Sequence, residues 1–253
     1  MTVVIDLHHR VDGPEGAPGV VLLHAIGTSM RMWAPQVPVL SRDHRVISID
    51  LRGHGRSPAP PGPYAMGELA GDVIALLNRV DIERASICGL SLGAMVGVTM
   101  AAIAPDRVDR LVAASVVAVP ASPAAWHERA QRVLAGGTDA ASDLVVERWG
   151  YRDRAPEIAG LVRDMLSATT PAGYAGCCEA IAGMDLRPEL PLVTAPTLLL
   201  AGSDDPAAPV SVARKMATAM PDARVTVIDG AAHLLNVEAA AATTEAILEH
   251  LGR

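Results

Sequence analysis

The sequence predicts an α/β protein in which a mostly parallel, twisted sheet is flanked by helices. Short runs of β-branched and other apolar residues alternate with stretches of helical periodicity along most of the chain. Several of these runs are apolar almost throughout, which is typical of strands covered on both faces. Alternating strands and helices favour a parallel sheet wrapped by helices.

Seven segments are expected to form strands, and three amphipathic or apolar segments are expected to form helices that pack on them. In residues 66–80 and 237–251, apolar side chains recur at three- and four-residue steps and give one apolar stripe. Residues 92–104 are apolar nearly all round, which predicts a buried helix. The expected strands are residues 2–9, 19–24, 45–50, 85–89, 110–117, 196–202 and 224–229.

One long segment breaks this alternation. From about Pro120 to Pro191 no run fits a strand, and helical patterns are separated by Gly and Pro. Because the segment lies between two strands of one sheet, we expect a helical insertion that caps the sheet. The predicted core domain is residues 1–119 and 192–253, and the predicted cap (lid) is residues 120–191.

The composition limits the kinds of partner. The chain has 253 residues, half of them hydrophobic, which suits one large domain or one domain with an insertion. Its 21 Lys and Arg against 28 Asp and Glu give a formal charge of −7, and no basic run stands out. A nucleic-acid partner is therefore not expected, because phosphate binding needs clustered cations.

Cysteine usage and the lack of long apolar stretches point to a cytoplasmic protein. The three cysteines, Cys88, Cys177 and Cys178, are odd in number and two are adjacent, which disfavours a disulfide framework and suits a reducing compartment. The first ten residues show no basic-then-apolar signal pattern, and no stretch of about 18 apolar residues occurs. We expect no membrane association.

The motif Gly-Leu-Ser-Leu-Gly at residues 89–93 places Ser91 between two glycines at a strand-to-helix junction. A sharp turn there strains the backbone of the central residue, and the flanking glycines leave room for neighbouring chain. The hydroxyl then lies at a helix N-terminus, where backbone N–H groups meet a developing negative charge. A tight packing turn is the alternative, but this position favours a nucleophile.

A serine nucleophile needs a base and an acid that orients the base, and in this architecture the order along the chain is Ser, Asp or Glu, then His. Two histidines follow the insertion. His250 lies in the last turn of the terminal helix, where a cation complements the helix dipole. His233 lies on a loop just past the strand at 224–229, and it is the predicted base.

The acid should follow the preceding strand, where Asp204 and Asp205 are adjacent. We choose Asp205, three residues after the strand-ending Gly202, because the acid usually has this spacing. Asp204 is expected to cap the turn with its side chain.

An oxyanion hole needs two donors. One should be the N–H of Leu92, next to the nucleophile, and the other the N–H of Ile26, in the loop after strand 19–24. His24 and His54 are expected to be structural, since neither belongs to a cluster with metal-ligand spacing. We expect no metal and no cofactor.

With these residues assigned, the chain resembles the α/β-hydrolase superfamily along its whole length. The matching pieces, in order, are "LLHAIG", "DLRGHGRS", "GLSLG", "AGSDDPAAP" and "GAAHLLNVE". More narrowly, the chain is similar to the 3-oxoadipate enol-lactonases of bacterial aromatic catabolism in "GTSMRMWAPQVPVL", "RGHGRSPAPPGPY", "GYAGCCEAIAGMDLRPELP" and "PDRVDRLV". The resemblance implies hydrolysis of 3-oxoadipate enol-lactone to 3-oxoadipate through an acyl-enzyme, in the β-ketoadipate pathway.

Two positions depart from the family pattern. Ala25 stands where the superfamily commonly has Gly and the lactonases often a small residue such as Ser, so the oxyanion loop should be tighter. After "VERW" the lactonases tend to continue with Phe, whereas this chain has Gly150, Tyr151 and Arg152. That stretch is expected to help shape the pocket.

The implied substrate carries a carboxylate, so the cap should offer a cation. We place Arg148 slightly ahead of the other arginines because Trp149 adjoins it, and Trp126 and Trp149 are expected to line the cavity. Solvated charge and ordinary packing remain open alternatives. The arginines of the insertion considered are Arg129, Arg132, Arg148, Arg152 and Arg154.

Other readings share the predicted triad. A carboxylesterase, another lactonase or a cofactor-free perhydrolase would use the same three residues. A non-catalytic ligand-binding protein of this fold would not need all of them, which disfavours it. In each enzymatic reading the partner is a small lactone or ester, expected to be anionic.

Overall fold

The protein is built on one seven-stranded sheet with the strand order β1-β3-β2-β4-β5-β6-β7. The structure is a computed structural model, and it describes residues 4–252. Strand β1 runs antiparallel to β3, and the remaining neighbours are parallel. The strands are β1 (His9–Asp12), β2 (Gly19–Leu23), β3 (Arg45–Ile49), β4 (Ala85–Leu90), β5 (Val108–Ala114), β6 (Thr197–Gly202) and β7 (Ala223–Ile228).

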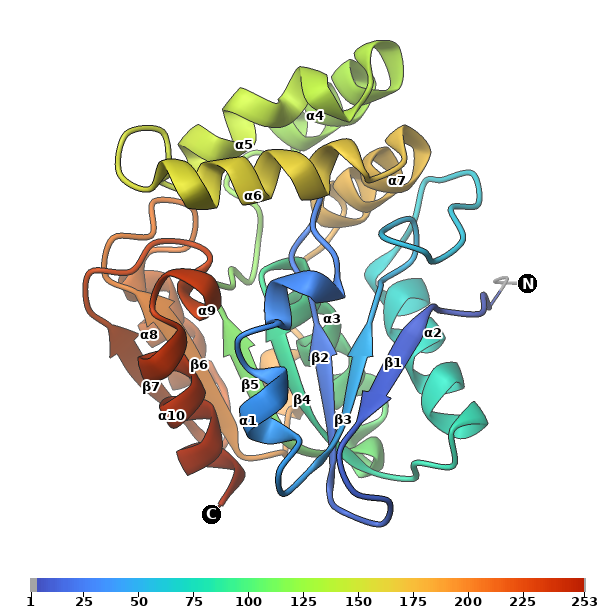
Figure 1. Cartoon of the computed structure of the whole chain (residues 1–253), viewed down its shortest axis with the longest axis vertical. Helices are drawn as coiled ribbons and strands as arrows, with labels where there is room; N and C mark the ends of the chain where they lie inside the picture. Colours follow the sequence, from blue (N-terminus) through green and yellow to red (C-terminus); the bar gives the residue numbers. More distant parts are fainter. Residues whose placement is uncertain (1–3, 253) are drawn as a thin grey trace.

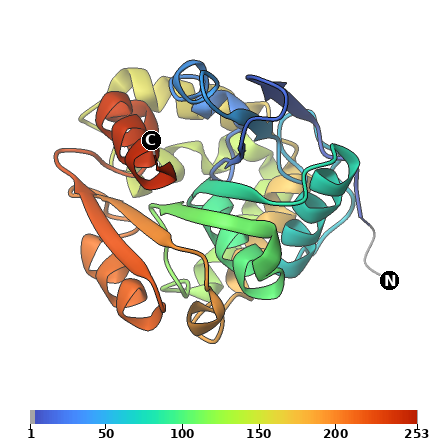
Figure 2. The ribbon, with the colours of Figure 1, turned by 90° about the horizontal axis from the view of Figure 1, so that it is seen from below.

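Helices cover both faces of this sheet (Figure 2). Helices α1 and α10 lie on one face, and α2, α3 and α8 lie on the other. Short helix α9 precedes α10, and α4 to α7 fall between β5 and β6. The helices are α1 (Val37–Leu40), α2 (Met66–Arg79), α3 (Leu92–Ile103), α4 (Pro123–Gly136), α5 (Ser142–Arg148), α6 (Pro156–Ser167), α7 (Pro171–Ala182), α8 (Val210–Ala219), α9 (Leu235–Glu238) and α10 (Ala240–Leu251).

The alternation of strands and helices is confirmed, but the predicted first strand is wrong. Of that segment, residues 2 and 3 lie outside the described part, residues 4–8 are not a strand, and β1 begins only at His9. Backbone N–H groups of residues 4–8 bond to side chains and not to a neighbouring strand. Ile5 N–H donates to Asp72 Oδ1 (3.1 Å), and His8 N–H donates to Ser57 Oγ (2.8 Å). The apolar side chains in this segment therefore indicate burial and not the pairing of a strand.

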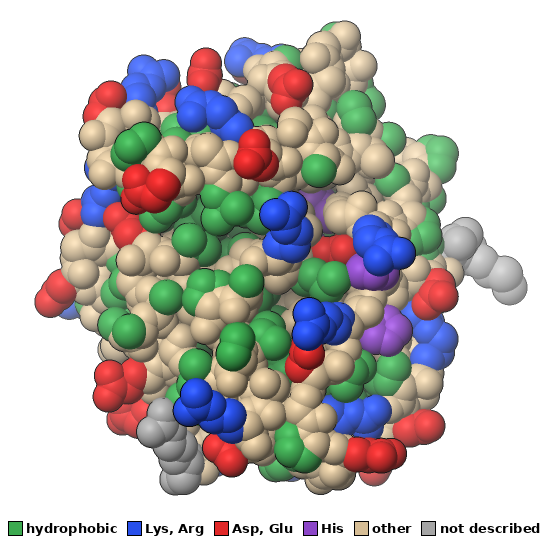
Figure 3. All heavy atoms as spheres, in the orientation of Figure 1, with side chains coloured by type: hydrophobic (Ala, Val, Ile, Leu, Met, Phe, Trp, Pro, Cys, Tyr) green, Lys and Arg blue, Asp and Glu red, His purple; other side chains and the backbone are tan. Residues whose placement is uncertain are grey.

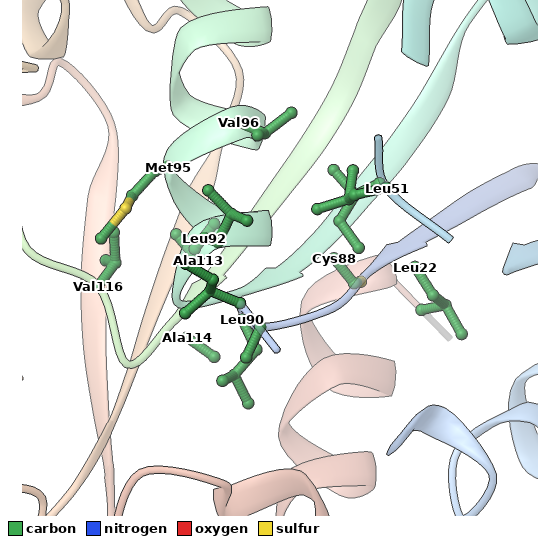
Figure 4. Packing of buried hydrophobic residues seen from close by; sticks show 14 of the residues in the cluster. Leu22, Leu51, Cys88, Leu90, Leu92, Met95, Val96, Ala113, Ala114 and Val116 are labelled. Atoms are coloured by element: carbon green, nitrogen blue, oxygen red, sulfur yellow. The ribbon is translucent and has the colours of Figure 1, made fainter. Parts of the chain in front are cut away.

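The centre of the core lies between α3 and strands β4 and β5. Every residue of β4 is buried, and α3 is buried from Leu92 to Ala101, so the prediction of an apolar, enclosed helix is confirmed. Figure 4 shows Met95 of this helix next to Val116 and Leu92 next to Ala113. A rigid, fully packed support therefore lies beneath the turn that joins β4 to α3.

Helices α4 to α7 lie above the carboxyl ends of the parallel strands (Figure 1). Residues 120–191, all of them described, contain no strand. Their helix starts follow capping rules: Ser122 Oγ accepts from Ala125 N–H before α4, Thr170 Oγ1 accepts from Gly173 N–H before α7, and each cap precedes a proline. The segment therefore sits where ligands bind in open α/β sheets.

Charged side chains of both signs lie on the surface, and the cysteines lie inside. Lys, Arg, Asp and Glu side chains are interspersed on the face shown in Figure 3. All three cysteines are free and buried, and burial raises the pKa of the Cys88 and Cys178 thiols to about 12. Within residues 4–252 we find no helix with the length and hydropathy of a membrane span.

Candidate active site

Ser91 lies on a strained turn between β4 and α3. Its backbone has φ 54° and ψ −113°, a combination that side-chain-bearing residues rarely adopt. The flanking glycines permit it: a Cβ on Gly89 would lie 2.3 Å from the Gly93 carbonyl oxygen, and one on Gly93 would lie 2.2 Å from the Leu23 carbonyl oxygen. The Gly-x-Ser-x-Gly spacing is thus required by close backbone contacts.

His233 and Asp205 form a buried hydrogen-bonded pair. His233 Nδ1 lies 2.9 Å from Asp205 Oδ2, and the two residues are 3% and 4% exposed. The other carboxylate oxygen accepts the N–H groups of Ala207 (2.8 Å) and Ala208 (3.1 Å). Burial raises the pKa of the Asp205 carboxyl, but the His233 contact and the two amides outweigh this, and the net shift is downward.

The second imidazole nitrogen of His233, Nε2, is the one that could accept a proton from Ser91. Nε2 is buried and has no hydrogen-bond partner among the described residues. Both His233 and Ser91 are anchored at the end of β5: Ser91 N–H donates to the Ala114 carbonyl (2.9 Å), and Ser115 Oγ donates to the His233 carbonyl (2.8 Å). The predicted nucleophile and base are therefore both bonded to the end of β5, at the adjacent residues Ala114 and Ser115.

Asp204 has a different environment from Asp205. Its carboxylate is exposed and accepts hydrogen bonds from Ser203 Oγ (2.8 Å) and Arg154 Nη1 (2.8 Å). These two contacts, Ser203 first, lower the pKa of Asp204. The expected capping of the turn by Asp204 is therefore wrong: Asp204 bonds to side chains on the surface, and the backbone amides of the turn bond to Asp205 instead.

Two buried histidines shape the loop that carries Ile26. The ring of His24 accepts the Leu51 N–H at Nε2 (2.9 Å), and the ring of His54 accepts the Gly27 N–H at Nε2 (2.9 Å). Each ring therefore holds its proton on Nδ1 and is neutral. Burial lowers the pKa of His24, and it lowers the pKa of His54 to about 3.

These histidines make folding stability depend on pH. Above about pH 6.5 they are neutral in both folded and unfolded chains, whereas at lower pH only the unfolded chain takes up the protons. We therefore expect stability to fall between about pH 6.5 and 3, with His54 contributing up to ~1.4 kcal/mol per pH unit. Urea unfolding at several pH values should give a shallower dependence for His54→Gln than for wild type. An unchanged dependence would contradict the assignment.

Leu92 and Ile26, whose N–H groups are predicted to form an oxyanion hole, both lie in backbone that its neighbours hold in place. Leu92 is the first residue of α3, so its N–H is one of those that a helix leaves without an intrahelical acceptor. Ile26 is buried in a turn that Thr28 closes, with Thr28 N–H (3.2 Å) and Oγ1 (2.8 Å) both donating to the Ala25 carbonyl. His54 holds the amide that follows Ile26, so the loop is fixed on both sides.

The three cap residues predicted to bind substrate do not lie together: two of them line a cavity, and the third packs on His233. Trp126 and Arg148 line a cavity of about 720 Å³ that also borders Pro206 and Ala207, next to the loop of Asp205. Trp149 is buried and packs on the His233 ring, with centroids 5.1 Å apart and planes at 30°. Trp149 therefore supports the imidazole.

The arginines of the cap differ in their partners. Arg152 pairs with Glu147, Arg154 pairs with Asp204 and Glu238, and Arg132 is exposed. Arg129, by contrast, is 6% exposed, and its Nε and Nη1 have no hydrogen-bond partner among the described residues. The sequence does not distinguish Arg129 from the other arginines, because its burial depends on the packing of α4 against α7, which is distant in the sequence.

A family model for the alpha/beta hydrolase family matches residues 20–246. The chain belongs to the alpha/beta hydrolase family. This hydrolase is 32% identical to 3-oxoadipate enol-lactonase 2 of Acinetobacter baylyi over 96% of the chain and 92% of the relative. The resemblance to the family is thus confirmed at the level of fold and of enol-lactonase relatives.

Solved structures of related hydrolases superpose closely on this one. The enol-lactonase of Burkholderia xenovorans LB400 has a TM-score of 0.94 and 40% identity, covering 98% of this chain and 97% of that one. A thermophilic esterase of Thermogutta terrifontis, solved with malate bound, has a TM-score of 0.91 and 31% identity, with coverage of 98% and 93%. This hydrolase is therefore similar to both enol-lactonases and esterases.

Proposed function

We propose that this alpha/beta hydrolase opens 3-oxoadipate enol-lactone to 3-oxoadipate, with Ser91 as nucleophile, His233 as base and Asp205 as orienting acid. The observation that carries the proposal is the buried Asp205–His233 hydrogen bond of 2.9 Å, with His233 bonded to Ser115 next to the Ala114 carbonyl that accepts from Ser91 on its strained turn. Enol-lactonase relatives at 32% and 40% identity support the choice of substrate.

The first half-reaction forms the acyl-enzyme. Ser91 Oγ attacks the ring carbonyl carbon while its proton passes to Nε2 of His233, which has no hydrogen-bond partner within residues 4–252. Collapse of the tetrahedral intermediate breaks the ring C–O bond, and the departing enol oxygen takes the proton from His233. The enol then tautomerises to a ketone, so the ring does not readily re-form.

The second half-reaction releases the acid. His233 takes a proton from water, the resulting hydroxide attacks the ester carbon, and the bond to Ser91 Oγ breaks as the proton returns to the serine. The N–H groups of Leu92 and Ile26 stabilise the oxyanion of each tetrahedral intermediate. Asp205 stays ionised throughout, as its lowered pKa favours, and keeps the Nδ1 proton of His233 in place.

We assign the substrate carboxylate to Arg129 together with Arg148. The guanidinium carbons of Arg129 and Arg148 lie 4.4 and 5.7 Å from the ring centre of Trp126. Burial lowers the pKa of Arg148, and the like charge of Arg129 lowers it further. The hydrogen bonds and ion pairs of the described residues include no carboxylate for either arginine, so an anion bound between them relieves the repulsion.

Replacement of Arg129 tests this assignment. We expect Arg129→Gln to raise KM for the enol-lactone by about 10- to 100-fold, the ~1.5–3 kcal/mol of a hydrogen bond to a charged group. Hydrolysis of neutral p-nitrophenyl acetate should change little, because it carries no carboxylate. Arg132→Gln is the matched control, since Arg132 is exposed on the same helix. An equal change in KM for both substrates would contradict the proposal that Arg129 binds the substrate carboxylate.

Carboxylesterase activity is the second candidate. A thermophilic esterase that is 31% identical to this chain was solved with malate, a carboxylate, bound. The two candidates separate by kcat/KM for the enol-lactone, followed by loss of its absorbance, against kcat/KM for short neutral esters. A large preference for the neutral esters would overturn the lactonase proposal.

We also propose that residues 120–191 act as a cap that excludes water from this site. Their helices lie over the strand ends that carry the three proposed catalytic residues (Figure 1).

The free, buried cysteines suit a reducing compartment, and we propose a cytoplasmic location on that basis.

A further inference from the structure

The turn that follows α5 in the cap, residues 149–154, is bonded directly to the loop that carries His233. The Trp149 carbonyl accepts the His233 N–H (3.4 Å), and the Trp149 ring packs on the imidazole. Gly150, at φ +83°, makes this approach possible: a Cβ there would lie 3.3 Å from both Ala232 Cβ and Pro206 Cδ. The turn therefore touches the loops of both proposed base and proposed acid.

Tyr151 and Glu238 hold the amides on either side of His233. The Tyr151 hydroxyl accepts the Leu234 N–H (2.8 Å) and donates to Glu238 Oε2 (3.3 Å). The same carboxylate oxygen accepts the Ala232 N–H (2.7 Å). The N–H groups of both residues that flank His233 thus depend on one tyrosine–carboxylate pair.

The Tyr151–Glu238 pair is buried, and Arg154 also bonds to it. Tyr151 is fully buried, and burial, followed by the charge of Glu238, raises its pKa, so the hydroxyl keeps its proton and can donate. Arg154 Nη2 binds the other carboxylate oxygen of Glu238 (2.8 Å) and also donates to the Gly230 carbonyl. Because the Glu238 side chain is 16% exposed, solvent offers a poor substitute for these partners.

We propose that Tyr151 and Glu238 are positioning residues that hold His233 in line with Ser91 and Asp205. The cap contributes no member of the triad, yet through Tyr151 it sets the position of the base. This inference rests on the proposed function of Ser91 and His233. It assigns a purpose to the Gly-Tyr-Arg stretch that departs from the enol-lactonase pattern.

The test replaces the hydroxyl alone. In Tyr151→Phe the Leu234 amide loses its acceptor and His233 is expected to move off line, and a small misplacement of a reacting group costs up to ~100-fold in rate. We expect kcat for p-nitrophenyl acetate to fall about 10- to 100-fold with KM within about twofold. Fluorophosphonate labelling of Ser91 should slow in proportion, because it needs the same base.

A spectroscopic signal separates positioning from mere stability. The proton between His233 Nδ1 and Asp205 should give a low-field ¹H resonance in wild type, and this resonance should broaden or vanish in Tyr151→Phe. Tyr64→Phe is the matched control, since the Tyr64 hydroxyl donates to the Pro60 carbonyl away from this loop. The control should keep both the resonance and the labelling rate.

Glu238 variants keep the proposal testable if Tyr151→Phe fails to fold. Glu238→Gln retains an oxygen acceptor and should label faster than Glu238→Ala, with wild type fastest. Wild-type labelling and an unchanged resonance in Tyr151→Phe or Glu238→Ala would overturn the positioning role while leaving Ser91 as nucleophile. Absence of label on Ser91 in the wild type would instead overturn the proposed function, and the inference with it.

Discussion

Replacement of Ser91 by alanine should abolish hydrolysis while the fold is retained. The serine Oγ is the atom proposed to bond to the substrate, and loss of a serine nucleophile in a hydrolase of this type lowers kcat by about 10⁴- to 10⁶-fold. Steady-state rates on the enol-lactone and on p-nitrophenyl acetate measure the loss. Thermal unfolding should show that the packing of α3 on β4 and β5 remains.

Ser86 provides a matched control for this experiment. It lies in the same strand, β4, and it is 6% exposed, close to the 7% of Ser91, but it lies toward the opposite end of the strand from the turn. Ser86→Ala should therefore keep nearly full activity. Retention of substantial turnover by Ser91→Ala on both substrates would show that another group carries the chemistry.

Asp205→Asn should cause the second largest loss, about 10⁴-fold in kcat. The asparagine oxygen could still accept the amides of Ala207 and Ala208, but its amide nitrogen would face His233 Nδ1. Two donors cannot pair, so the imidazole would turn or adopt the other tautomer, with its proton on the nitrogen that must accept from Ser91.

Asp204→Asn is the internal comparison for Asp205→Asn. Asp204 is exposed and bonded to Ser203 and Arg154, so its neutralisation should cost less than about tenfold, within the range of surface contacts. The ratio of kcat between the two variants checks the choice of acid. A larger loss for Asp204→Asn than for Asp205→Asn would reverse the assignment.

Much of the fold could be predicted because strands covered on both faces leave a strong apolar pattern. The buried helix after Ser91 and the helical segment 120–191 followed from the same patterning. The first strand could not be predicted correctly, since residues 4–8 are partly buried by contacts with α2 and the 50–57 region while their amides bond to side chains such as Asp72 and Ser57. Periodicity does not reveal which partner a backbone amide takes.

The candidate triad was accessible from sequence because each member follows the carboxyl end of a strand. That rule places Ser91 after β4, Asp205 after β6 and His233 after β7, which meet at one edge of the sheet. The substrate-binding residues of the cap were harder to predict. Preference for Arg148 over Arg129 depended on an adjacent tryptophan, whereas the structure stacks both arginines on Trp126.

The contacts around Tyr151 were not accessible at all. Its partner Glu238 lies 87 residues away in the sequence, and no local spacing connects them. The one signal was the departure from the lactonase pattern at Gly150 and Tyr151. Such a departure indicates a position of interest, but only the packing of the cap turn against the His233 loop shows what the Tyr151 side chain contacts.

The covalent intermediate tests the central claim most directly. Because the leaving enol of a lactone stays attached to its acyl group, ring opening by Ser91 should add the full mass of the lactone to the enzyme. Rapid acid quench during turnover, followed by peptide mapping by mass spectrometry, should find that added mass on the peptide containing Ser91. The same mass on a different residue would contradict the account.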